Sequence, residues 1–176
     1  SPVTIGDQAL AKMKQRKSPA PTWFHDLGLI DGYWSEGATR AYHHTAPVNS
    51  IFALTEALRL LKQEGLDQAW ERHQENSYRL VSGLRRLGLD MLVQDPAVRL
   101  PQLNAVRLPV DIDETAIRSR LLNEKNLEIG AGLGPLAGKV WRIGLMGYSS
   151  RPENVSFCLD ALGRELGGAI QNAVGE

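Results

Sequence analysis

Apolar side chains recur at helical spacing in two adjoining stretches, residues 47–65 and residues 66–88. In each stretch they form one stripe with charged side chains off it, as an amphipathic helix requires. The stripes are Ile51, Leu54, Ala57, Leu58 and Leu61, then Leu66, Ala69, Trp70, His73, Leu80, Leu84 and Leu87. Because glycine commonly ends helices, Gly65 predicts either a boundary between two helices or a bend in one long helix.

Before residue 47 the pattern is weaker. Residues 3–5 predict a short strand, and Asp7 predicts the N-cap of a helix that ends in a basic segment before Pro19. Residues 22–39 hold several large aromatic side chains among glycines, without periodicity. We therefore expect irregular structure in this segment, packed against a large surface.

After residue 88, short apolar segments alternate with helical ones, which is typical of an α/β domain. Expected strands are residues 90–93, 105–108, 127–129 and 140–146, and expected helices are residues 113–126 and a last helix running toward Gly167 and Gly168. That last helix opens with the capping-box pattern Ser150-Arg151-Pro152-Glu153. Short strands covered by helices predict an open sandwich and leave both parallel and antiparallel pairing open.

The charge balance and the composition narrow the kinds of partner. Twenty basic and twenty acidic side chains cancel, which removes the long-range field of a protein that binds nucleic acid or an anionic membrane. Hydrophobic residues make up 43% of the chain, without a run long enough to span a membrane. We expect a globular protein with no nucleic-acid or membrane partner. The single cysteine, Cys158, favours a reducing compartment and therefore a cytoplasmic location, and we expect it to be a small core residue rather than a nucleophile.

Arg142 interrupts an otherwise apolar predicted strand. Alternation puts its side chain on the same face as Gly144, where the missing side chain leaves room for a ligand. A guanidinium fork matches a carboxylate in two parallel hydrogen bonds, which predicts a site for a substrate carboxylate. The alternative is a structural ion pair with a buried Asp or Glu.

The run Tyr42-His43-His44-Thr45 comes directly before the helix predicted from residue 47. Thr45 is either the N-cap of that helix or, together with Tyr42, part of a phosphate cup in which two hydroxyls join the free amides of the helix N-terminus. Two adjacent histidines with no third ligand at a suitable spacing do not predict a metal site.

The glycine-rich run Gly130-Ala131-Gly132-Leu133-Gly134-Pro135 lacks the following helix that a dinucleotide-binding loop needs. It predicts either a loop whose backbone closely approaches a ligand or another chain, or an ordinary connection between strands. The spacing alone leaves both alternatives open.

Four motifs, taken in order, resemble the alanine–glyoxylate and serine–pyruvate (serine–glyoxylate) aminotransferases of class V. They are RAYHHTAPV at residues 40–48, LTEAL at 54–58, QDPAVRLP at 94–101, and GLGP at 132–135 followed by WRIGLMG at 141–147. The resemblance covers nearly the whole chain and implies an α/β fold, the C-terminal half of a fold type I aminotransferase. Residues 1–46 would be the tail of the large cofactor domain with a dimer-interface segment, residues 47–88 linking helices, and residues 89–176 the small C-terminal domain.

The same resemblance implies amino transfer from alanine or serine to glyoxylate or pyruvate, with pyridoxal 5′-phosphate as cofactor and amino acids and 2-oxo acids as substrates. It implies that Arg142 holds the substrate carboxylate, and that Tyr42 and Thr45 reach the cofactor phosphate of the neighbouring subunit in a homodimer. The family's Schiff-base lysine lies upstream of Ser1, and its motif does not occur in this chain. We therefore expect the 176-residue chain to be inactive unless the missing N-terminal half is supplied. The alternative function is a non-catalytic oligomerisation or interaction domain derived from this family.

Overall fold

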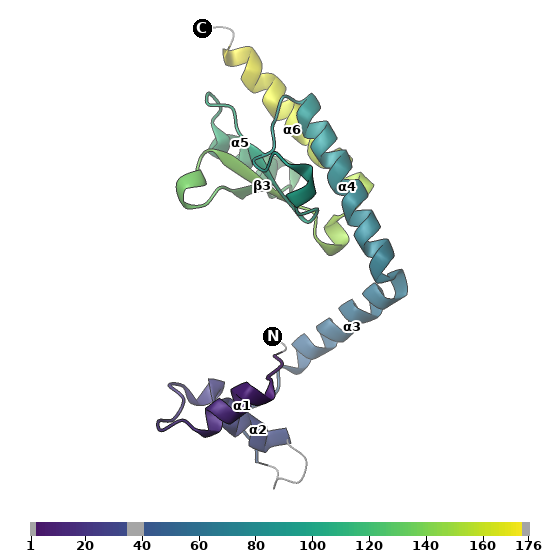
Figure 1. Ribbon diagram of the computed structural model, residues 1–176. Coiled ribbons are helices and arrows are strands. Elements are labelled where there is room, and N and C mark those ends of the chain that lie inside the picture. The colour runs from purple at the N-terminus through teal and green to yellow at the C-terminus, as the bar shows by residue number, and fades with distance from the viewer. Residues whose placement is uncertain (1–2, 35–40, 174–176) are drawn as a thin grey trace. The chain divides into compact units, whose positions relative to one another are not determined.

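The structure is a computed structural model that describes the backbone of residues 3–34 and 41–173, with the side chains of these residues except 34 and 168–173. Arg40, the first residue of one of the resemblance motifs, lies outside the described residues. The chain divides into two compact units, Ser1–Ala57 and Leu58–Glu176. Figure 1 draws both units with their main elements labelled.

The first unit contains short helical segments and the first half of a longer helix. They are α1 (Asp7–Lys14), the 3₁₀ turn η1 (Trp23–His25), α2 (Leu27–Trp34) and the start of α3 (Val48–Glu64). α1 confirms the predicted N-terminal helix, but its N-cap is Gly6 and no side chain caps it, so the capping role predicted for Asp7 is wrong. Residues 3–5 are not a strand, because the described part of this unit offers no neighbouring strand to share hydrogen bonds.

α2 lies within the segment expected to be irregular, so that expectation is wrong for residues 27–34. Asp26 explains where the helix starts. Its carboxylate accepts hydrogen bonds from the backbone N–H groups of Gly28 at 2.9 Å and Leu29 at 3.3 Å. This N-cap satisfies amides that a helix start leaves free, and it offsets the weak helix propensity of the glycines in the segment.

Two separate helices, α3 and α4 (Leu66–Arg86), form the region of the two amphipathic stripes. Gly65 separates them, because its φ of 92° is left-handed and interrupts a right-handed helix, and glycine adopts it without strain. In α4 the second half of the apolar stripe is buried, with Leu80 and Leu84 fully enclosed, whereas Leu66 and Trp70 near its start are exposed. In α3 no residue is buried, and apolar side chains such as Phe52 and Leu58 stay exposed.

The second unit contains a three-stranded sheet with the order β1-β3-β2, antiparallel throughout. β1 (Leu103–Arg107) and β3 (Val140–Gly144) confirm two predicted strands, and β2 is the short pair Gly130–Ala131. The other two predicted strands are wrong. Residues 90–93 make only an isolated bridge to β1, and residues 127–129 pack against the core without a ladder partner before β2 begins.

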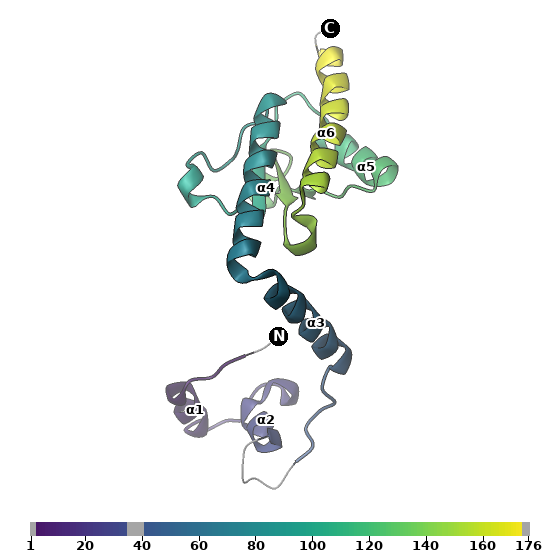
Figure 2. The same ribbon diagram turned by 90° about the vertical axis from the view of Figure 1, so that its right-hand side faces the viewer.

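Three helices cover one face of this sheet: α4, α5 (Glu114–Lys125) and α6 (Pro152–Ala173). α4 and α6 lie side by side in both views (Figures 1 and 2). The largest fully buried apolar side chains between the helices and the sheet are Trp141, Leu80, Leu84, Leu89, Ile117, Leu121, Leu162 and Val106. This core anchors β3 from one side and leaves its other face for a site.

The ends of α5 and α6 show how far local signals fix a helix. α5 confirms the predicted helix, with Asp113 capping its start through the Ala116 N–H and Asn126 ending it in the left-handed conformation. α6 continues past Gly167 and Gly168, where the sequence suggested an end.

Short 3₁₀ turns connect the elements of the second unit: η2 (Pro96–Val98), η3 (Gly134–Leu136) and η4 (Gly147–Ser149). No helix in the described part of the chain has the length and apolar character needed to cross a membrane.

Candidate active site

Arg142 projects from the face of β3 opposite the core. Its neighbours Trp141 and Ile143 are buried, while Arg142 is half-buried and Gly144 is exposed. The Arg142 Nε donates a hydrogen bond to the Ala131 carbonyl of β2 at 2.7 Å. Gly130 is the register partner of Arg142, and a Cβ added there would lie 3.4 Å from the Arg142 Nη2. The guanidinium therefore lies over β2.

The structure does not support the ion-pair alternative for Arg142. No Asp or Glu within the described part of residues 58–176 pairs with it, whereas Arg72, Arg118 and Arg120 each have a carboxylate partner. Its two terminal nitrogens have no hydrogen-bond partner in that part of the chain. The geometry that remains is a half-buried guanidinium fork with two nitrogens available to an anion.

The glycine loop after β2 is packed tightly against itself. A Cβ on Gly132 would lie 2.0 Å from the backbone oxygen of Leu136, so only glycine fits there. Gly134 has a φ of 53°, which also favours glycine. Close backbone approach is thus explained by contacts inside the loop, and the approach of a ligand remains a prediction.

Tyr42 and Thr45 are brought together in the first unit. The Tyr42 hydroxyl and the Thr45 Oγ1 form a hydrogen bond to each other, and both side chains are exposed. α3 begins at Val48, and its first intrahelical bond runs from the Ile51 N–H to the Pro47 carbonyl. Thr45 therefore lies three residues before the helix, and its hydroxyl pairs with Tyr42.

His43 anchors the turn that carries these hydroxyls, a role that the sequence did not indicate. It is 6% exposed, its ring stacks on Trp23 at a centroid distance of 4.0 Å, and its Nε2 lies 3.1 Å from the Trp23 carbonyl oxygen. Its Nδ1 lies 2.7 Å from the Nδ1 of His44. Within residues 3–34 and 41–173, no three His, Cys, Asp or Glu side chains are grouped so that they could hold a metal ion.

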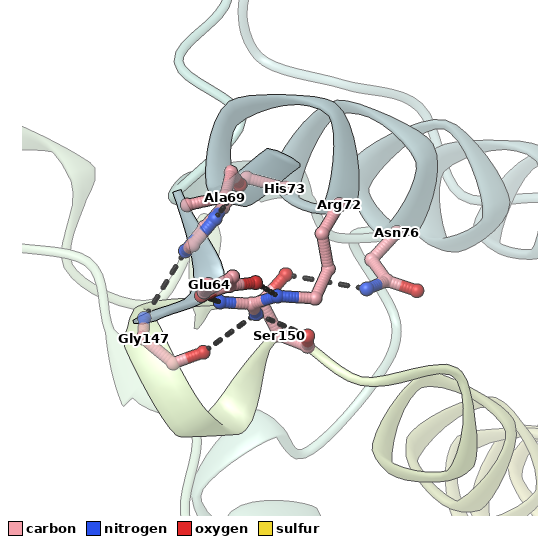
Figure 3. Close-up of polar contacts among 7 residues, drawn as sticks. All are labelled: Glu64, Ala69, Arg72, His73, Asn76, Gly147 and Ser150. Atoms are coloured by element: carbon pink, nitrogen blue, oxygen red, sulfur yellow. Dashed lines mark hydrogen bonds and ion pairs between the residues drawn. The ribbon is translucent and has the colours of Figure 1, made fainter. Parts of the chain in front are cut away.

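A polar cluster between α4 and η4 was also missed by the sequence analysis (Figure 3). Arg72 Nη1 donates to the carbonyls of Gly147 at 2.9 Å and Ser150 at 2.7 Å. The Glu64 carboxylate accepts from Arg72 Nε at 2.5 Å and from Arg72 Nη2 at 3.0 Å. His73 Nε2 accepts the Gly147 N–H at 3.1 Å, and its Nδ1 lies 2.6 Å from the Ala69 carbonyl oxygen. The cluster ties the end of β3 to α4, and no local sequence signal could join residues so far apart.

The first turn of α5 is likewise tied to β3. Glu114 accepts from Arg118 Nε at 2.7 Å and from the indole N–H of Trp141 at 3.3 Å. The hydrogen bond from Arg118 is the main reason that the pKa of Glu114 is lowered, against the opposing effect of burial. Trp141 is thereby fixed directly beside Arg142 in the strand.

None of the six lysines occupies a desolvated position. Lys12, Lys14, Lys17, Lys62 and Lys139 are exposed, and Lys125 is half-buried. A lysine that reacts with carbonyl compounds is usually activated by desolvation or by a neighbouring cation, and burial of that kind is missing at all six positions.

A guanidinium fork on a helix-backed sheet and paired hydroxyls before a helix N-terminus are typical of an enzyme that binds small anions. The family model described as aminotransferase class-V matches residues 3–154, and the chain belongs to this family. This confirms the family suggested by the sequence motifs.

Individual relatives agree with the family. The chain is 39% identical over 165 residues to the alanine–glyoxylate aminotransferase of Rattus norvegicus. This alignment covers 93% of the chain and 40% of the rat protein. It is 39% identical over 179 residues to the (S)-ureidoglycine–glyoxylate transaminase of Bacillus subtilis, and this alignment covers 97% of the chain and 42% of that protein. The crystal structure of an alanine–glyoxylate aminotransferase from Nostoc sp. matches with a TM-score of 0.85 at 46% identity, covering 93% of this chain and 42% of that one.

The chain spans about two-fifths of the length of these relatives. It has the α/β fold of the C-terminal portion of fold type I aminotransferases, as the sequence analysis expected.

Proposed function

We propose that the full-length protein containing this chain is a pyridoxal-phosphate-dependent aminotransferase that uses glyoxylate or pyruvate as amino acceptor. The favoured reaction converts alanine and glyoxylate into pyruvate and glycine, and serine is the alternative donor. The observation that carries the proposal is the free guanidinium fork of Arg142 in a chain of the class-V family. Relatives named as glyoxylate and pyruvate transaminases support this choice of substrates.

Arg142 holds the carboxylate that amino acids and 2-oxo acids share. Its Nε is engaged by the Ala131 carbonyl, which sets the plane of the guanidinium. The two terminal nitrogens then form parallel charge-assisted hydrogen bonds to the carboxylate oxygens. Gly144, two residues along the same face, leaves space beside that carboxylate.

The residues before α3 fit the phosphate end of pyridoxal 5′-phosphate. Two exposed hydroxyls, from Tyr42 and Thr45, lie within hydrogen-bond distance of each other. The Val48 N–H bonds to the Ala46 carbonyl at 2.8 Å, and the next two amides of α3, at Asn49 and Ser50, are left without an intrahelical partner by the geometry of a helix start. Hydroxyls and helix N-terminal amides are common phosphate ligands. When bound, the cofactor supplies an electron sink for the substrate's α-carbon. The lysine that the family uses is expected outside these 176 residues.

The proposed assembly is a homodimer in the cytoplasm, in which Tyr42 and Thr45 serve the cofactor of the neighbouring subunit. Nucleic acid and membranes are not among the proposed partners. Light scattering on the full-length protein tests the dimer, since a fully active monomer would contradict it.

A second candidate is a non-catalytic oligomerisation domain. The exposed apolar side chains of α3, including Ile51, Phe52 and Leu58, favour it, because apolar helix faces of this size are normally covered. Both candidate functions predict that the protein self-associates, so only an assay of amino transfer distinguishes them.

The experiment is a transamination panel with the full-length protein. Alanine and serine are tested as donors and glyoxylate and pyruvate as acceptors, with and without added pyridoxal 5′-phosphate. The proposal expects cofactor-dependent formation of glycine or alanine from the matching acceptor. Association without amino transfer in any combination would favour the second candidate.

A further inference from the structure

Met146 borders the open space beside Arg142. A Cβ on Gly144 would point to the same face of β3 as Arg142, and the nearest atom it would meet is the Met146 Cε at 3.9 Å. The Met146 side chain is apolar and yet 57% exposed. Its thioether end therefore forms an edge of the surface on which Arg142 presents its guanidinium.

The backbone of Met146 is fixed from both sides. Before it, Leu145 is buried and its N–H bonds to the Gln102 carbonyl at 2.8 Å. After it, the N–H of Gly147 is held by His73 and the carbonyl of Gly147 by Arg72 (Figure 3). A shift of the Met146 backbone would therefore strain the hydrogen bonds that hold Leu145 and Gly147.

Arg72 makes no hydrogen bond with Arg142, but it holds both ends of η4. It bonds the Gly147 and Ser150 carbonyls, and its own orientation is set by the bidentate contact with Glu64. Loss of Arg72 would release the carbonyl side of Gly147 while β3 itself stayed paired in the sheet. We therefore expect the loss of Arg72 to affect the surface around Arg142 through a displacement of Met146.

We propose that Met146 is a specificity-determining residue of the proposed aminotransferase and that Arg72 is its positioning residue. This inference rests on the proposed function. A substrate whose carboxylate pairs with Arg142 above Gly144 has the Met146 thioether as its apolar neighbour. That wall provides no hydrogen bond or charge for a second carboxylate, and it limits the size of the group next to the 2-oxo carbon. Small uncharged substrates are favoured.

The test uses the aminated form of the full-length enzyme and its half-reaction with three acceptors of increasing size: glyoxylate, pyruvate and 2-oxobutyrate. Because one methylene in a binding pocket changes specificity by roughly tenfold or more, Met146→Ala should raise the rate-constant ratio of 2-oxobutyrate to glyoxylate by about tenfold. The matched control is Met91→Ala, the same chemical change at a core methionine that is 3% exposed. It should lower the melting temperature and leave the ratio unchanged. An unchanged ratio in Met146→Ala overturns the proposal.

The role of Arg72 is tested by a double-variant cycle. Arg72→Met should shift the same ratio in the same direction, by less, and should shift it no further when combined with Met146→Ala. A lower melting temperature with an unchanged ratio would show that Arg72 only stabilises the fold, and equal shifts in both backgrounds would show that Arg72 does not act through Met146. Either outcome overturns its positioning role. A parent enzyme that transfers no amino group would overturn the proposed function, whereas an active parent with insensitive ratios would overturn this inference alone.

Discussion

Replacing Arg142 with alanine in the full-length enzyme separates a substrate-binding role from a structural one. In the described second unit, the side chain makes one hydrogen bond, to the Ala131 carbonyl. Losing that bond should lower the free energy of unfolding by only about 1 kcal/mol, a few degrees in melting temperature. Losing a charge-assisted pair with a substrate carboxylate should cost on the order of 3 kcal/mol, which is about a hundredfold in kcat/KM.

The assay measures the melting temperature and the alanine half-reaction on the same preparation. Arg142→Lys keeps the charge without the fork, so it should weaken carboxylate substrates while leaving cofactor binding nearly intact. The matched control is Arg120→Ala, which removes the ion-pair partner of Glu165. That control should lower the melting temperature and leave the half-reaction of the folded enzyme near normal. Unchanged half-reaction kinetics in Arg142→Ala would remove Arg142 from the active site.

Three further predictions concern the fold around the site. Gly132→Ala would place a Cβ 2.0 Å from a backbone oxygen of Leu136, and should lower the free energy of unfolding by about 1–3 kcal/mol in denaturant titrations. The hydrogen bond from Arg118 lowers the folded-state pKa of Glu114. The stability that ionised Glu114 contributes is therefore present above its unfolded pKa of about 4.3 and is lost as the pH falls through the lower folded value. Glu114→Gln should therefore flatten the fall in melting temperature below about pH 4.3, and an unaltered profile would contradict this. Burial raises the pKa of the Cys158 thiol to about 11, so thiol reagents at neutral pH should label it rapidly only after unfolding, and fast labelling of the native protein would contradict its core position.

Patterns within short stretches of sequence predicted the helices and strands that show a clear pattern of their own. Apolar periodicity with a terminating Gly65 located α3 and α4, and the helix expected over residues 113–126 is α5. β1 and β3 were found because each is long enough to show its own pattern. The strands predicted at residues 90–93 and 127–129 failed because a strand depends on a partner that lies elsewhere in the sequence.

Within the candidate site, too, some residues stand out from their local sequence and others do not. The fork at Arg142 could be predicted because a guanidinium in an apolar strand beside a glycine is a local anomaly. The contacts of Arg72 with Gly147 and Ser150 join residues more than seventy positions apart. A composition or spacing argument could not reveal them, because α4 and η4 meet only in the folded unit.

The central claim, amino transfer from alanine to glyoxylate by the full-length protein, is tested most directly by following the nitrogen atom. The protein is incubated with ¹⁵N-labelled alanine, glyoxylate and pyridoxal 5′-phosphate, and the products are analysed by mass spectrometry. We expect one molecule of pyruvate for each molecule of ¹⁵N-labelled glycine, with no released ammonia. Unlabelled glycine, labelled ammonia, or no turnover of alanine would contradict it.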